Sequence, residues 1–248
     1  MKRTTVLAGL LILSAGCARG PLEAVCPNIA AGGLAVSEVR GNQSGLDTWG
    51  QWIEIYNSTA VPVEAGGLVL RLTDADPVTC TASGPTCDCA PGQDGKSSHC
   101  GCGFDQDCAA DGVCEGGACH EFTDIMLLDS SLVIEPGAYL VAGRFPAYDL
   151  PAHVDYGYEA QFGSSLYDAA RLQLLTCDAL GNDVLVDEVA WTDLPSKGSW
   201  AFDGARTLTA AANDDQSAWC VDDTMPAPGD GTAQGAPGTP GEVNPSCK

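Results

Sequence analysis

The chain has 248 residues and is strongly acidic, with 33 Asp and Glu against 11 Lys and Arg and a formal net charge of −22 at pH 7. Such a surface repels nucleic acid, so we expect no nucleic-acid partner. The acidic excess favours solubility, and loose binding of divalent cations is the alternative explanation.

The first sixteen residues have the pattern of an export signal. Lys2 and Arg3 give a basic start, residues 6–13 form an apolar run too short to span a bilayer, and residues 14–16 are small. We therefore expect the mature protein to lie outside the cytoplasm.

Residues 13–17, Leu-Ser-Ala-Gly-Cys, resemble the bacterial lipobox, in which cleavage leaves an N-terminal cysteine that is then lipidated. The resemblance implies a signal peptide over residues 1–16, a lipid at Cys17 and a tether over residues 17–33. Ala18 stands where an Asp would imply the inner membrane, so the expected location is the outer membrane or surface of a Gram-negative cell. A secreted or periplasmic protein, with Cys17 discarded or paired, is the alternative.

The number of cysteines fits disulfide bonds in an oxidising compartment. There are thirteen, so assigning Cys17 to lipid leaves an even number. Eight of them crowd into one stretch: Cys80, Cys87, Cys89, Cys100, Cys102, Cys108, Cys114 and Cys119. The other four lie outside it: Cys26, Cys177, Cys220 and Cys247. Both groups are even, as two separately bridged units require.

The four outer cysteines allow three pairings. Cys177 and Cys220 each end a predicted strand, whereas Cys26 and Cys247 flank the domain at its two ends. We therefore predict a Cys177–Cys220 bond and a Cys26–Cys247 bond.

Alternating apolar and polar residues predict β-strands on both sides of the cysteine-rich stretch. The strongest is residues 50–57, Gly-Gln-Trp-Ile-Glu-Ile-Tyr-Asn. Glu54 shares a face with Trp52 and Tyr56, and we interpret it as a solvated strand carboxylate rather than a polar group placed beside aromatics. Further strands are predicted over residues 34–40, 68–73, 138–143, 171–176, 184–191 and 217–220. No segment has a sustained helical period, which indicates an all-β sandwich of seven or eight strands.

Residues 74–121 interrupt this pattern with eight cysteines among Gly, Ser, Asp and Pro residues. We predict a disulfide-rich, largely irregular insert, since a loop of this length without structure of its own does not fit a compact domain. Loops at the end of a rigid sandwich commonly carry its contacts, so we expect a partner to bind the insert.

Several motifs, in order, resemble the lamin tail domain, an immunoglobulin-like β-sandwich widespread in exported bacterial proteins. They are residues 50–57, 66–68 (Gly-Gly-Leu), 135–141 (Glu-Pro-Gly-Ala-Tyr-Leu-Val), 186–191 (Val-Asp-Glu-Val-Ala-Trp), 217–219 (Ser-Ala-Trp) and 238–244 (Gly-Thr-Pro-Gly-Glu-Val-Asn). The resemblance implies one sandwich formed by residues 34–73 and 122–244, with the insert at residues 74–121 between its two parts.

Motifs that suggest phosphate or metal binding lack required features. Residues 90–97 come close to a P-loop, but the first glycine is replaced and no strand precedes them. The cysteines around His99 lack the two-residue spacers of a zinc site. Asp105, Asp107 and Asp111 lack the glycine and the terminal glutamate of an EF-hand loop, which leaves only weak calcium binding open. We predict no metal site and no cofactor.

The remaining titratable residues form no catalytic set. The three histidines lie in no motif that would expose a nucleophilic serine. Two pairs of adjacent acids are present: Asp187 with Glu188 and Asp222 with Asp223. Neighbours on a strand point to opposite faces, so we interpret these acids as solvated surface groups and predict no catalytic residue.

These features favour a non-catalytic, lipid-anchored protein of the cell envelope that binds a protein or glycan through the sandwich and the insert. The alternative is an accessory or divergent exported hydrolase for phosphodiester or glycosidic substrates, because lamin tail domains are often joined to exported nucleases and phosphatases. The chain carries no second domain with catalytic residues, which favours the binding module.

Overall fold

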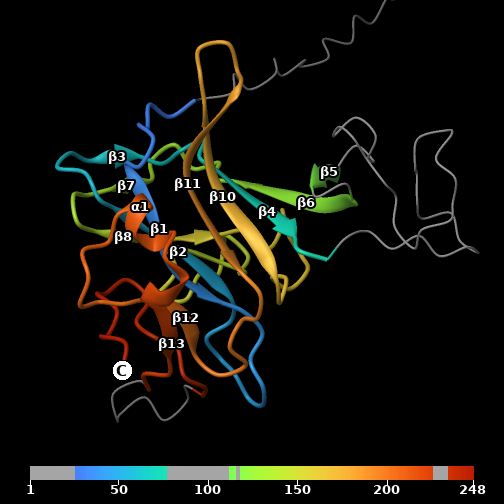
Figure 1. Cartoon of the computed structure of the whole chain (residues 1–248), viewed down its shortest axis with the longest axis vertical. Helices are drawn as coiled ribbons and strands as arrows, with labels where there is room; N and C mark the ends of the chain where they lie inside the picture. Colours follow the sequence, from blue (N-terminus) through green and yellow to red (C-terminus); the bar gives the residue numbers. More distant parts are fainter. Residues whose placement is uncertain (1–25, 77–111, 116–117, 226–233) are drawn as a thin grey trace, which may run out of the picture.

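The computed structural model describes residues 26–76, 112–115, 118–225 and 234–248. These residues form an all-β fold built on two large sheets (Figure 1), as the alternating pattern predicts. One sheet has six strands in the order β13-β12-β1-β2-β8-β9, and the other has five in the order β11-β10-β4-β6-β5. A two-stranded sheet, β3-β7, lies beside them.

The six-stranded sheet has β2, the predicted strand of residues 50–57, near its centre. Its members are β13 (Trp219–Asp222), β12 (Ser199–Phe202), β1 (Leu34–Arg40), β2 (Trp52–Asn57), β8 (Tyr139–Gly143) and β9 (Tyr156–Gly157). Only β8 and β9 pair in parallel.

The five-stranded sheet is antiparallel throughout. Its members are β11 (Asp183–Trp191), β10 (Ala170–Cys177), β4 (Val69–Asp74), β6 (Ala118–Met126) and β5 (Gly112–Glu115). The small sheet pairs β3 (Val63–Glu64) with β7 (Val133–Ile134). The helical elements among the described residues are α1 (Ala210–Asn213), capped by the Thr209 side chain, and the 3₁₀ turn η2 (Gln216–Ala218).

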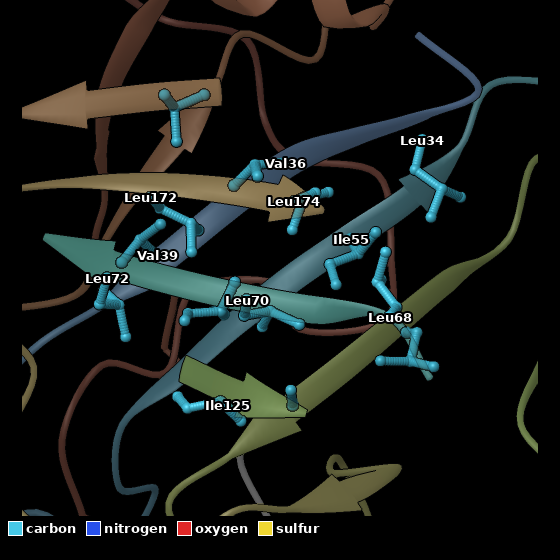
Figure 2. Close-up of a cluster of buried hydrophobic side chains, with 14 of the residues drawn as sticks. Leu34, Val36, Val39, Ile55, Leu68, Leu70, Leu72, Ile125, Leu172 and Leu174 are labelled. Atoms are coloured by element: carbon cyan, nitrogen blue, oxygen red, sulfur yellow. The ribbon is translucent and has the colours of Figure 1, made fainter. Parts of the chain in front are cut away.

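The two large sheets share one apolar core, which Figure 2 shows between β1 and β2 on one side and β4, β6 and β10 on the other. Alternate residues of each strand point into it. The fully buried members include Leu34, Val36, Val39, Ile55, Leu70, Leu72, Ile125, Leu172 and Leu174. Burial of one such side chain is worth about 1.5–3 kcal/mol, so this layer is the main source of stability.

Strand β11 is an edge of its sheet, and groups from neighbouring segments bind its free carbonyls. The Gly32 N–H donates to the Val186 carbonyl at 2.8 Å, and the Gln216 side-chain amide donates to the Ala190 carbonyl at 2.6 Å. Unpaired strand edges attract other chains. These contacts therefore close the sandwich along this side.

Two disulfides are paired differently from the prediction. Cys26 bonds to Cys177, with Cα atoms 5.1 Å apart, and Cys220 bonds to Cys247, with Cα atoms 5.8 Å apart. The predicted Cys177–Cys220 and Cys26–Cys247 bonds are wrong. Cys177 ends β10 at the projecting β10–β11 hairpin, whereas Cys220 lies in β13, in the other sheet and at the opposite end of the molecule (Figure 1).

The predicted insert is not irregular throughout. Strand β6 crosses residue 121 without a break, pairing with β5 in its first part and with β4 in its second. Thr73 and Phe122 are partners across β4 and β6, so the chain leaves and re-enters the sandwich through adjacent strands. Cys119 of β6 takes part in a disulfide. The remaining predicted positions of the insert, from Cys80 to Cys108, and the lipidation site Cys17 lie outside the described residues.

Candidate functional site

Three carboxyl groups are buried on the outer face of the six-stranded sheet, opposite the apolar core. Glu38 of β1 and Glu54 of β2 are partners across the two strands, and both are fully buried. Asp222 of β13 is 2% exposed. Alternation along β2 sends Ile53 and Ile55 into the core and therefore sends Glu54 to this face.

A β-bulge in β1 brings Glu38 to the same face. The register shifts between Val36 and Glu38, which makes Ser37 the extra residue. Without it, Glu38 would share the face of Val36 and point into the core. The Ser37 hydroxyl donates to Glu54 Oε1 at 2.6 Å, so the bulge also supplies a partner for the second carboxyl.

Residues 234–248, which we name the strap, cover these carboxyls. The Gly241 N–H donates to Glu54 Oε2 at 2.5 Å. Thr239 Oγ1 lies 2.9 Å from Asp222 Oδ2 and 3.4 Å from Glu38 Oε2. The burial of the two glutamates therefore depends on a segment far away in the sequence.

The strap is fixed on both sides of these contacts. The Arg40 guanidinium donates to the Ala236 carbonyl at 3.2 Å, and the Asn244 side-chain amide donates to the Ser37 carbonyl at 2.9 Å. Three residues after Asn244, Cys247 is bonded to Cys220. Gly238 lies between the Arg40 and Asn244 contacts. A Cβ at Gly238 would stand 2.6 Å from Glu38 Oε1, so only glycine lets the strap lie this close to the sheet.

Burial without a basic partner raises the pKa of both glutamates. Among the described residues, no ion pair includes either glutamate. Arg40, a buried cation of the same strand as Glu38, pairs instead with Asp47 at 2.7 Å. Burial raises the pKa of Glu38 to about 7, and the charge of Asp222 adds to this effect. Burial also raises the pKa of Glu54 well above its ordinary value, and the charge of Glu38 adds to it. Both groups keep their protons to higher pH than exposed glutamates.

Aromatic side chains continue the face beyond the carboxyls. Trp52 Nε1 donates to Glu38 Oε1 at 3.2 Å, and its ring centroid lies 5.3 Å from that of His153. The His153 ring also contacts Trp49 and Phe145. Burial lowers the pKa of His153, which favours the neutral imidazole.

Three interpretations made from the sequence are corrected here. Glu54, Asp187 and Asp222 are not solvated, because their exposed fractions are 0%, 4% and 2%. Asp187 Oδ2 accepts hydrogen bonds from the Val36 N–H at 2.7 Å and the Asn213 side chain at 2.8 Å. Asp187 thereby joins β11 to β1, and burial raises its pKa to about 6.

Glu38 is not among the site residues predicted from the sequence. A signal was present, because Leu34, Val36 and Glu38 are alternate residues of the predicted strand and the first two are apolar, so this row is expected to face the core. An acid in such a row indicates either a bulge or a buried polar group. The structure contains both.

The two described histidines, His120 and His153, do not meet in one site. His120 Nδ1 lies 2.9 Å from the Asp74 carbonyl on the five-stranded sheet, and His153 Nε2 lies 3.1 Å from the Trp49 carbonyl by the six-stranded one. Across the described ranges, no group of three or more His, Cys, Asp or Glu has the geometry to hold a metal ion. The P-loop-like stretch, His99 and Asp105 to Asp111 lie outside those ranges.

Comparison with protein-family models, with curated proteins and with solved structures found no match to this chain. No helix in the described part of the chain is long and apolar enough to cross a membrane.

Proposed function

We propose that this chain is a non-catalytic, lipid-anchored protein of the bacterial cell envelope that binds a protein or glycan partner. In this proposal a lamin tail-like, immunoglobulin-like sandwich is the scaffold and the cysteine-rich insert carries the contacts. Cys17 holds the protein to the outer membrane.

Support for the scaffold comes from its construction. Two sheets, antiparallel except for the β8–β9 pair, enclose a single core, and a core between two such sheets is the arrangement of an immunoglobulin-like sandwich. The Cys26–Cys177 and Cys220–Cys247 bonds fasten the segments before β1 and after β13, and disulfides of this kind persist in oxidising compartments.

The observation that carries the proposal is where the insert begins and ends. Thr73 and Phe122 are partners on adjacent strands, so the chain leaves and re-enters the sandwich at one point. Segments inserted between neighbouring strands of a sandwich are commonly used for binding. By contrast, the buried carboxyls of the sheet face have no access to solvent while the strap covers them.

Crosslinking in intact cells tests this function. We expect the wild-type chain to capture a discrete partner and a chain with residues 77–121 replaced by a Gly-Ser turn to lose it. Leu180→Ser, in the exposed tip of the β10–β11 hairpin, serves as a matched control because it alters a different displayed loop. Capture that survives the replacement places recognition on the sandwich instead.

Membrane fractionation tests the anchor. We expect Cys17→Ser to move the protein from the membrane to the soluble fraction or to block its processing, because the lipid supplies the membrane affinity. An unmodified mature N-terminus found at another residue would contradict the lipid anchor. Hydrolysis of phosphodiester or glycosidic substrates by the purified chain, abolished by a chelator, would favour the alternative hydrolase.

A further inference from the structure

If all carboxyls under the strap are ionised, one hydroxyl faces more acceptors than its proton can serve. Thr239 Oγ1 lies within hydrogen-bonding distance of three acceptors: Glu38 Oε2, Asp222 Oδ2 and Asn244 Oδ1. Its hydroxyl has a single proton to donate. The amide oxygen of Asn244 faces it because the amide nitrogen is bound to the Ser37 carbonyl.

A proton on one of the carboxyls turns one of these acceptors into a donor, and Glu38 is the better holder. Asp222 Oδ1 already accepts bonds from the Thr224 N–H at 3.0 Å and the Thr224 hydroxyl at 2.5 Å, so this carboxylate has donors of its own. Glu38 is fully buried and has no basic partner among the described residues. A protonated Glu38 can donate to Thr239, which in turn donates to Asp222.

The charges around Glu38 and Glu54 are almost all negative. Asp222 faces Glu38 from β13, and Asp155 faces Glu54 from the segment between β8 and β9. Tyr139 of β8 lies in the same field, and burial together with the charge of Glu54 raises the pKa of its phenol to about 12. The Tyr56 ring of β2 lies 5.0 Å from that of Tyr139. Arg40 of β1 forms an ion pair with Asp47 rather than with either glutamate. His153 contacts the Trp52 ring, and burial lowers the pKa of its imidazole. The strap itself contributes only backbone and hydroxyl groups to the carboxyls.

The strap is held differently along its length. Its ends depend on Arg40, on Asn244 and on the Cys220–Cys247 bond, and none of these contacts requires a protonated carboxyl. Its middle, residues 238–241, rests directly on Glu38 and Glu54.

We propose that residues 238–241 form a pH-dependent latch, which stays closed over the six-stranded sheet while Glu38 and Glu54 are protonated and opens when both ionise. Two adjacent negative charges without a cation must regain water, and lifting the middle of the strap is the shortest way to admit it. Opening exposes the row formed by Glu38, Glu54 and Trp52 while both ends of the strap stay attached.

Hydrogen exchange of the full chain, expressed as protection factors to remove the intrinsic effect of pH, tests the latch. Between pH 5.5 and pH 8.5, we expect protection of residues 238–244 to fall at least tenfold. Amides of β4 and β10 serve as the internal reference and should change little. Glu38→Gln/Glu54→Gln, which mimics the protonated pair, should keep the strap protected at both pH values.

Glu242→Gln is the matched control, because Glu242 is an exposed acid on the strap itself and its removal should leave the pH response intact. Each single glutamine variant is measured as well, so the test does not depend on the double variant folding. Each should lose the response, because one of the two groups can no longer ionise. Equal protection of the wild-type strap at both pH values overturns the latch. So does a response that persists undiminished in the glutamine variants.

Discussion

At the scale of single residues, partners decide the state of a buried charge in this protein. Arg40 and Glu38 lie two positions apart in β1, and both are buried. Arg40 donates to a carboxylate, Asp47, and to the Gly50 and Ala236 carbonyls, so its buried guanidinium is paired. Glu38 has hydroxyl, indole and backbone N–H donors but no cation, and protonation takes the place of the missing positive charge.

The pKa of Glu38 predicts that the fold loses stability as pH rises. The pKa of Glu38 is about 7 in the folded chain against 4.5 for an exposed glutamate, so the folded state binds the proton more tightly. This contribution is complete below pH 4.5 and is lost as pH rises through 7. At ~1.4 kcal/mol per pH unit, the loss is on the order of 3 kcal/mol.

Urea unfolding at pH 5 and pH 8 measures this effect. Carboxyls with lowered pKa values, such as Asp215 at about 2, do not obscure it, because they stay ionised across the whole interval. Glu38→Gln should flatten the dependence. A free energy of unfolding that increases from pH 5 to pH 8 would contradict the prediction.

Asp187 predicts a second effect on stability. Replacing it with Ala leaves the Val36 N–H and the Asn213 amide without their acceptor in a buried position, and each such loss costs about 1–3 kcal/mol. Asp187→Asn retains an acceptor oxygen and should cost less. Thermal unfolding at pH 7.5 compares the two variants, and equal losses would show that the hydrogen bonds contribute little.

At the scale of elements, the strap demands glycine for two separable reasons. Gly238 and Gly241 have almost the same positive φ, 83° and 81°. Only Gly238 is crowded, since its Cβ would stand 2.3 Å from Ser199 Oγ, whereas Gly241 has nothing within 4 Å.

We therefore expect Gly238→Ala to cost more stability than Gly241→Ala. Backbone strain alone accounts for about 1 kcal/mol at either position. The clash should add about 1–3 kcal/mol at Gly238 or detach the strap from the sheet. Differential scanning calorimetry of both variants gives the comparison, and indistinguishable melting temperatures would mean that the strap does not pack as closely as described.

The elements also show what the sequence predicts and where it falls short. Alternation is a local property, so β2, β10 and β11 could be predicted from their own residues. The burial of Glu54 could not, because the group that covers it, Gly241, lies 187 residues away. The predicted cysteine pairing was wrong because it also depends on residues far apart in the sequence. The order of the strands in the two sheets places Cys177 beside Cys26 rather than beside Cys220.

At the scale of the whole molecule, the apolar core between the two large sheets is formed by residues outside the insert. The core draws on β1 and β2 from one sheet and on β4, β6 and β10 from the other. Leu70, Leu72 and Ile125 supply the part contributed by β4 and β6, and all three lie outside the insert.

Replacing residues 77–121 with a short Gly-Ser turn should consequently leave a cooperatively folding β protein. Thr73 and Phe122 already face each other, so a short turn can join their strands. Loop length affects closure by only about 0.6 kcal/mol per doubling. We expect a melting temperature within a few degrees of the full chain and an unchanged near-ultraviolet circular dichroism signal from the tryptophans.

Two observations point to a part of the insert that could contribute to the core: β5 pairs with β6, and Cys119 is only 4% exposed. If the replacement abolishes cooperative unfolding, this end of the insert is part of the core, and a second variant that restores residues 112–121 should recover the transition.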